Sequence, residues 1–138
     1  MISRTRLLAL PAAAALALLL STTASADITA LSYNSPANLS VSNTEATVTG
    51  LVVCSLTDVS VDVTAQIIQS QGRHVIIASG STTVLCATTG SGSPQQWTVL
   101  ASTPQGAALK PGSASIFISA FNSTFTSSKS VSGPISLH

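Results

Sequence analysis

Apolar and polar residues alternate along much of the chain, and the clearest case runs from Val59 to Ile67. There Val, Ala and Ile occupy the odd positions, while Ser, Asp, Thr and Gln occupy the even positions. A period of two residues is that of a β-strand with one face in the core and the other in solvent. This segment therefore predicts a half-buried strand whose odd-numbered side chains point inward.

Several other segments are also rich in β-branched residues or alternate in the same way. Gly50 indicates a β-bulge in the segment 44–54, and Gly80 separates the segments 73–79 and 82–86. Gly133-Pro134 interrupts the segment 130–137 and places it at a sheet edge. The segments are residues 27–43, which form a leader strand and turn, then 44–54, 73–79, 82–86, 96–101, 115–121 and 130–137.

No stretch after residue 26 shows the 3.6-residue apolar period of an amphipathic helix. Seven or eight short strands separated by Gly, Pro and Ser/Thr turns are typical of an antiparallel sandwich. The predicted fold class is therefore all-β.

The first 26 residues have the three parts of a secretory signal peptide. Arg4 and Arg6 supply the charge, residues 7–20 are almost all Leu and Ala, and Ala24-Ser25-Ala26 forms a small-residue cleavage site. The alternative is a membrane anchor, but about 20 apolar residues are needed to cross a bilayer and this run is shorter. We therefore expect a signal peptide at 1–26, a single domain at 27–138, and secretion without stable membrane insertion.

Removal of the signal changes the charge balance. Residues 27–138 keep three basic and four acidic side chains, so the net charge becomes 3 − 4 = −1. A phosphate backbone is held by many Lys and Arg residues, which this domain lacks. Nucleic acid is excluded as a partner, and a basic membrane-binding face is excluded for the same reason.

Two cysteines remain after cleavage, Cys54 and Cys86. An even pair in an exported chain predicts a disulfide, which would close a loop of about 30 residues and contribute on the order of 3 kcal/mol. A metal site needs more ligands than two Cys and two scattered His provide. We expect no metal and no cofactor.

Candidate catalytic residues are few. His74 is the only internal histidine, His138 is the last residue and is expected to fray, and no G-x-S-x-G motif occurs. Asp58 and Asp62 are the closest pair of carboxylates, and they fit solvated strand positions, with an Asp62–Arg73 ion pair as a simple role for one of them. The sequence predicts that the protein is not an enzyme.

The aromatic residues are the best candidates for a contact surface. Phe117 and Phe121 share one face of the 115–121 strand, while Ile116 and Ile118 share the other. One face must be core, so the other is a candidate contact patch. Trp97 could be a stacking platform for sugar, but it alternates in register with Val99, which favours the core.

Residues 50–121 carry a pattern that resembles small secreted immunoglobulin-like domains of unknown function from high-GC Gram-positive bacteria. The residues that carry it are Gly50-x-x-x-Cys54, Val61-x-Val63-x-x-Gln66, Gly72-Arg73, Gly80, Cys86, Gln96-Trp97-x-Val99 and Lys110-Pro111-Gly112-Ser113-Ala114.

The resemblance implies an immunoglobulin-like sandwich with a Cys54–Cys86 disulfide and Trp97 packed near it. It implies no established activity. The Cys-x-Gly step that often follows the second cysteine is replaced by Cys86-Ala87-Thr88, so a different loop is expected there.

Two functions from different classes follow. The first is a secreted, non-enzymatic β-sandwich that contacts an unknown protein or a cell-wall component. The alternative is a carrier for a small ligand or carbohydrate, with a cleft lined by Phe117, Phe121 and Trp97. Such a cleft would leave Trp97 partly exposed. A hydrolase ranks last.

Overall fold

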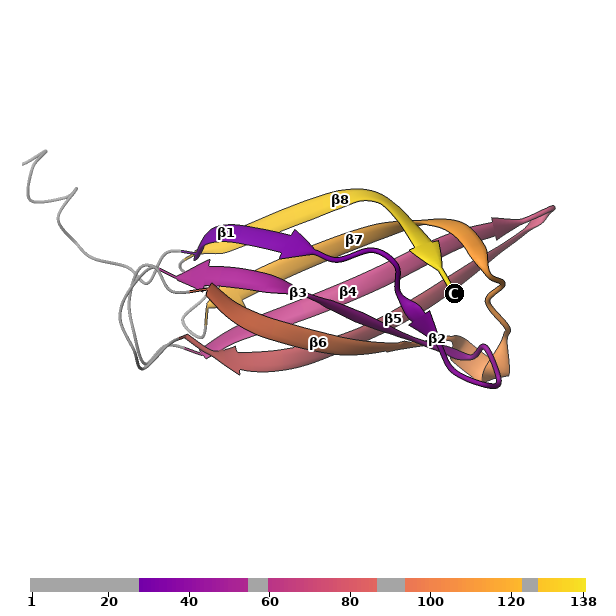
Figure 1. Cartoon of the computed structure of the whole chain (residues 1–138), viewed down its shortest axis with the longest axis horizontal. Coiled ribbons are helices and arrows are strands. Elements are labelled where there is room, and N and C mark those ends of the chain that lie inside the picture. Colours follow the sequence, from indigo (N-terminus) through magenta and orange to yellow (C-terminus); the bar gives the residue numbers. More distant parts are fainter. Residues whose placement is uncertain (1–27, 55–59, 87–93, 123–126) are drawn as a thin grey trace, which may run out of the picture.

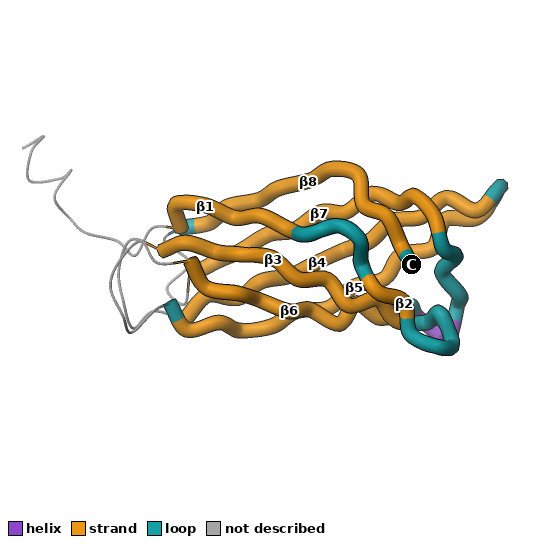
Figure 2. The backbone as a smooth tube through the Cα atoms, viewed as in Figure 1, coloured by secondary structure: helices purple, strands orange, loops and turns teal. Residues whose placement is uncertain are grey.

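The computed structural model describes residues 28–54, 60–86, 94–122 and 127–138, and most of them lie in strands (Figure 2). The predicted signal peptide, Asp58, Val59 and the loop after Cys86 lie outside these ranges. One short 3-10 helix, η1 (Pro104–Gly106), precedes the seventh strand. The strands are β1 (Ile28–Tyr33), β2 (Asn38–Leu39), β3 (Glu45–Cys54), β4 (Ser60–Gln71), β5 (His74–Leu85), β6 (Pro94–Ser102), β7 (Gly112–Asn122) and β8 (Ser128–Leu137).

The strands pair in the order β1-β3-β6-β5-β4-β7-β8, with β2 added beside β3, and every strand pair is antiparallel (Figure 1). The only pair between β5 and β6 in the described part is Ser79 with Ser102. The strands thus fall into a group of three, β1-β3-β6, and a group of four, β5-β4-β7-β8. The whole sheet curls into a near barrel.

This arrangement confirms the predicted immunoglobulin-like sandwich. In that fold the strands A, B and E lie in one sheet, and C, F and G lie in the other. Here β1, β3 and β6 take the places of A, B and E, and β4, β7 and β8 take those of C, F and G. The strand β5 lies beside β4 at the edge of the second group.

Alternating side chains from both groups fill the core. In β4 the buried positions are Val61, Val63, Ala65 and Ile67, which confirms the inward face predicted for this strand. In β7 the buried positions are Ile116, Ile118, Ala120 and Asn122. The two aromatic residues of β7, Phe117 and Phe121, therefore lie on its outer face.

β4 is longer than the alternation predicts, because its core-facing row continues with a polar residue. Gln69 is 5% exposed. Its amide nitrogen donates to the carbonyl of Lys110 at 2.7 Å, and its amide oxygen accepts from the Lys110 backbone N–H at 2.8 Å. Gln71 adds a hydrogen bond to the carbonyl of Ala108. These bonds tie the segment before β7 to β4, so a buried glutamine extends the strand to Gln71.

Two glycines have roles other than those predicted. β3 pairs with β6 in unbroken register through Gly50, so the expected bulge is wrong. A Cβ on Gly50 would lie 2.0 Å from the Ser32 carbonyl oxygen and 2.4 Å from Cζ2 of Trp97. Glycine is needed here because β1 and the indole approach its backbone closely.

Gly80 does not separate two strands, since β5 runs continuously from His74 to Leu85. A Cβ at this position would lie 2.1 Å from the carbonyl oxygen of Leu100. The glycine therefore lets the backbone of β6 come close to β5 at the point where the two strand groups meet. The break predicted at Gly80 was wrong for this reason.

β8 continues through Gly133-Pro134, and its outer edge faces β1. Pro134 is opposite Ser115, and its carbonyl accepts a hydrogen bond from the Tyr33 hydroxyl at 2.9 Å, on the side away from β7. In an antiparallel sheet the backbone N and C=O of one residue point to the same side of the strand. The nitrogen of Pro134 therefore also points away from β7, and no hydrogen bond between β7 and β8 is lost because proline has no N–H. The prediction of an edge position for this proline fits the structure.

The last residues pair with the segment after β1. Ala37 forms a parallel bridge with Leu137. The backbone N–H of Leu39 donates to the carbonyl of His138 at 2.7 Å, and the N–H of His138 donates to Ala37. The expectation that His138 frays is therefore wrong.

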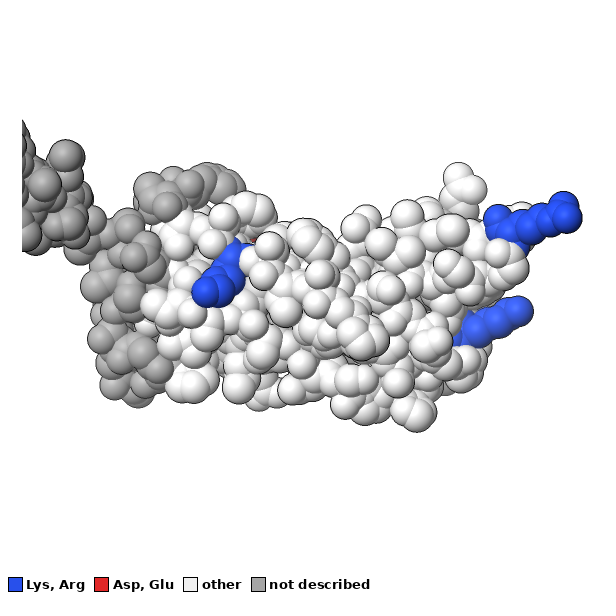
Figure 3. Space-filling model, turned by 90° about the horizontal axis from the view of Figure 1, so that it is seen from above, with Lys and Arg blue, Asp and Glu red and all other residues white. Residues whose placement is uncertain are grey.

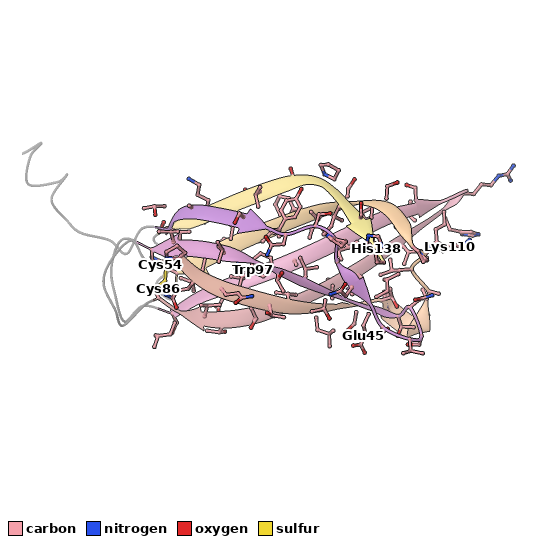
Figure 4. All side chains as sticks on the ribbon, viewed as in Figure 1. Glu45, Cys54, Cys86, Trp97, Lys110 and His138 are labelled. Atoms are coloured by element: carbon pink, nitrogen blue, oxygen red, sulfur yellow. A yellow bond between two sulfur atoms is a disulfide. The ribbon has the colours of Figure 1, made fainter. Side chains whose placement is uncertain are left out.

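The disulfide predicted between Cys54 and Cys86 is present, with the two Cα atoms 6.0 Å apart. Cys54 ends β3 and Cys86 follows β5, so the bond connects the two strand groups at one end of the sandwich (Figure 4). Both cysteines and Trp97 belong to the same buried core.

Candidate contact surface

The group of four strands presents one broad face to solvent, which we call the outer face. It is formed by the side chains of β5, β4, β7 and β8 that alternate with the core residues. They are Ser60, Asp62, Thr64, Gln66, Ile68 and Ser70 of β4, Val75, Ile77, Ser79, Ser81, Thr83 and Leu85 of β5, Ser113, Ser115, Phe117, Ser119 and Phe121 of β7, and Ser128, Ser130, Ser132, Pro134 and Ser136 of β8.

Phe117 lies in a central strand of this face. It is 44% exposed, and its neighbours across the sheet are Gln66 on β4 and Ser132 on β8. Phe121 is half-buried one row further along β7 than Ser119, opposite Asp62. The sequence proposed one face of this strand as a contact patch, and the structure assigns both phenylalanines to solvent.

Two hollows flank Phe117 along the outer face. One, of about 260 Å³, lies over Ser119 between the two phenylalanines, and Ser128, Lys129 and Ser130 complete its wall. The other, of about 500 Å³, lies over Ser115 on the opposite side of Phe117. Small serines set the floor of both hollows, so the Phe117 ring stands between them as a ridge. The second hollow is lined by Ile68, Ser115, Ile116, Phe117, Ser132, Gly133 and Pro134.

The outer face also carries apolar residues that the sequence analysis did not single out. Ile77 of β5 is 41% exposed and lies directly opposite Ile68 of β4. Ile68 and Pro134 both line the hollow beside Phe117, so these side chains continue the apolar surface across the sheet. The sequence does contain a signal, because Ile67-Ile68 and Ile76-Ile77 are consecutive pairs. Successive side chains of a strand point to opposite faces, so one isoleucine of each pair must point outward.

Charge is nearly absent from this face. Asp62 is its only ionisable residue among the strand positions that the structure describes, and its Oδ1 accepts a hydrogen bond from the Thr83 hydroxyl at 2.8 Å. Lys129 borders the face, and its Nζ reaches the carbonyl of Thr29 on β1. Seen over β8 and its neighbours, basic side chains lie towards the two ends of the domain and a long uncharged surface lies between them (Figure 3).

The predicted ion pair between Asp62 and Arg73 is not formed. Arg73 belongs to the turn between β4 and β5, beyond Gln71. With a rise of about 3.3 Å per residue, that turn lies roughly 30 Å along β4 from Asp62. Thr83 is the partner of Asp62 instead.

Trp97 is not part of the contact surface. Its side chain is 1% exposed and packs over Gly50, inside the sandwich. The indole N–H is buried and has no hydrogen-bond partner within the described ranges. The core position favoured by its alternation with Val99 is confirmed, while the cleft expected to join Trp97 with Phe117 and Phe121 is wrong, because the indole and the two phenyl rings lie on opposite sides of the sheet.

The described residues do not bring catalytic groups together. His74 begins β5 opposite Gln71, at the far end of β4 from Asp62. Within residues 28–54, 60–86, 94–122 and 127–138, no three His, Cys, Asp or Glu side chains gather where they could hold a metal ion. The same ranges contain no helix long and apolar enough to cross a membrane.

Comparison with known proteins adds no family. No protein-family model matches the chain, and no curated protein matches it significantly.

Proposed function

We propose that this protein is an exported, non-enzymatic, disulfide-stabilised β-sandwich that acts as a binding module through its outer face. The observation that carries the proposal is the position of Phe117. A large apolar ring that is 44% exposed lies in the middle of a four-stranded face with very little charge and stands between two hollows. Aromatic residues, phenylalanine among them, are enriched in protein interfaces relative to the rest of the surface.

Two features support export. The first 26 residues have the charge, apolar run and small-residue site of a cleavable signal. The disulfide between Cys54 and Cys86 is of a kind that persists in oxidising compartments and is rare in the cytosol. We therefore place the mature domain, residues 27–138, outside the cell. Its membership of the secreted immunoglobulin-like family named above stays a prediction.

The character of the outer face narrows the class of partner. Nucleic acid and acidic polymers are bound through clusters of Lys and Arg, and the strand positions of this face carry none. Serine and threonine hydroxyls both donate and accept hydrogen bonds. A neutral protein surface or a neutral cell-wall component fits this combination of hydroxyls and apolar rings.

A second candidate is a carbohydrate-binding role. The hollow over Ser119 places two phenyl rings beside the hydroxyls of Ser119, Ser128 and Ser130. A sugar ring offers an apolar face for an aromatic ring and hydroxyls for the serines. At about 260 Å³ the hollow is smaller than the usual range of enclosed ligand sites, so we place it second to contact with a larger surface.

The test compares two substitutions on opposite sides of the sandwich. Phe117→Ser removes the central ring of the outer face. Leu100→Ser removes a side chain that is 53% exposed on β6, in the other strand group, and serves as the matched control. The purified proteins are tested for binding to isolated cell-wall material, to neutral polysaccharides and to purified secreted proteins. Binding that the Leu100→Ser variant retains and the Phe117→Ser variant loses supports the proposal. Binding that neither substitution changes refutes it.

A further inference from the structure

We infer that the macromolecule that covers the outer face is a second copy of this chain, in a twofold-symmetric dimer that buries Phe117 of both copies. The inference rests on the proposed function, since it names the partner of the same surface. Three properties of the face support it: its charge, its relief and its size.

The charge of the face permits contact with itself. In a twofold interface the same patch is present on both sides, so every charge cluster would meet charges of its own sign. Like charges brought together cost several kcal/mol. The outer face limits this cost because its described residues carry only two charged groups and neither lies at its centre. Asp62 lies opposite Phe121 and accepts a hydrogen bond from Thr83, and Lys129 lines the hollow over Ser119 while its Nζ reaches the carbonyl of Thr29. A face with so little charge also offers a charged partner few side chains of opposite charge to bind.

The relief of the face is self-complementary. Phe117 protrudes between the hollow over Ser115 and the hollow over Ser119. A twofold axis makes each contact reciprocal, so a ring that enters a hollow of the partner brings the partner's ring into its own hollow. Ile68 and Pro134 line the larger hollow and supply an apolar wall for an incoming ring. Burial of both rings would remove from water the most exposed aromatic side chain of the described structure.

The size of the face is sufficient for a weak dimer. The ladder between β7 and β8 has ten residue pairs. Four strands about 4.8 Å apart, each rising about 3.4 Å per residue, give a face of roughly 19 Å by 34 Å, or about 650 Å² per copy. Because the sheet curls, two copies would bury at most about 1,300 Å², and the lower end of the range for specific interfaces begins near this value. A dissociation constant on the order of 1–100 μM suits an interface of this size and modest apolar content.

The opposite side of the sandwich is less suited to this contact. It has exposed leucines of its own, Leu51 on β3 and Leu100 on β6, but β1, β3 and β6 make it one strand narrower. This side therefore supplies the control substitution rather than the proposed interface.

The experiment measures the mass of the exported protein in solution with its disulfide intact. Sedimentation equilibrium from about 1 to 500 μM should show one chain at low concentration and two at high concentration, a span that brackets the expected dissociation constant. Phe117→Ser should weaken the dimer at least about tenfold, because it truncates the side chain at the centre of the interface. Ser119→Arg should weaken it as strongly, since it brings two like charges together. Leu100→Ser should leave the constant unchanged, and thermal unfolding of each variant confirms that it is folded.

Salt separates this dimer from an electrostatic one. Between about 0.05 and 0.5 M NaCl the dissociation constant should change less than about threefold, because charge pairs that salt would screen are absent from the face. A protein that stays monomeric throughout the concentration range overturns the inference. So does a dimer that Leu100→Ser weakens and Phe117→Ser does not.

The two proposals fail in different ways. A monomer that still binds cell-wall material or a secreted protein through Phe117 overturns the dimer and leaves the proposed function standing with another partner. A dimer that depends on Phe117 supports the inference whether or not such material binds. Absence of both kinds of binding overturns both proposals.

Discussion

The tight contact at Gly50 gives the sharpest prediction for stability. A methyl group on this residue would lie 2.0 Å from the Ser32 carbonyl oxygen, 2.4 Å from Cζ2 of Trp97 and 2.6 Å from its Cε2. Ordinary van der Waals contact begins at 3.4 Å, so the first distance is short by about 1.4 Å. The backbone of β1 and a fully buried indole must both move to admit the methyl group.

Overpacking of a dense core costs about 1–3 kcal/mol, and more where backbone must shift. We therefore expect Gly50→Ala to lower the free energy of unfolding by about 2–4 kcal/mol. At about 4 °C per kcal/mol for a domain of this size, Tm falls by roughly 8–16 °C. Urea unfolding followed by far-ultraviolet circular dichroism measures the change.

A double-mutant cycle with Trp97→Phe tests the cause. The smaller ring withdraws the atoms nearest Gly50 and also removes the buried indole N–H that has no partner. The double variant should be more stable than the sum of the single losses predicts, by at least about 1 kcal/mol. Rescue should be partial, because the contact with the Ser32 carbonyl remains. A Gly50→Ala protein within about 0.5 kcal/mol of the parent, or additive effects in the cycle, would refute this explanation of the glycine.

Three further predictions concern the disulfide, the buried glutamine and the export signal. Replacing Cys54 and Cys86 together by Ala opens a loop with a sequence separation of 32. Denaturant unfolding should show that the free energy of unfolding falls by about 3–4 kcal/mol, while the circular dichroism spectrum of β structure is retained. Unchanged stability would show that the disulfide does not stabilise the fold. Gln69→Leu leaves the N–H and C=O of Lys110 without their partner and should cost about 1–3 kcal/mol, whereas Gln66→Leu on the outer face should change the same measurement by less than about 0.5 kcal/mol. Intact mass of the exported protein should match a chain that begins at Asp27 and is two hydrogens lighter than the dithiol form, and free-thiol labelling without reduction would contradict it.

Much of the fold could be predicted from the sequence because alternation is a local property. The inward face of β4 follows from residues 59–67 alone, and the position of Trp97 follows from its register with Val99. The two faces of β7 were also separated correctly. Which of them is buried depends on the strands that pack against it, so the sequence left that choice open.

The features that were missed depend on contacts between distant segments. Gly50 and Gly80 are visible as glycines, but their roles follow from the approach of Trp97 and Ser32 to one and of Leu100 to the other. Gln69 ended the predicted strand because a polar residue broke the alternation. Its partner, the backbone of Lys110, is 41 residues away, and the sequence around Gln69 gives no indication of this contact.

The candidate surface shows the same division. Alternation alone placed Phe117 and Phe121 together on one face. Ile68, Ile77 and Pro134 join that face only once β5, β4, β7 and β8 are known to be neighbours in this order.

The parallel contact between the segment after β1 and the end of β8 has a mechanical consequence. Six antiparallel steps separate β1 from β8, so the two strands run in the same direction, and Ile28 and His138 lie at opposite ends of the domain (Figure 1). A pull applied through these two residues slides β1 past β8. The bonds of Ala37 and Leu39 to residues 136–138 then carry the load together rather than one after another. A force that pulls the two ends of the domain apart therefore loads these hydrogen bonds in shear, which is the direction in which a hydrogen-bonded strand pair resists most.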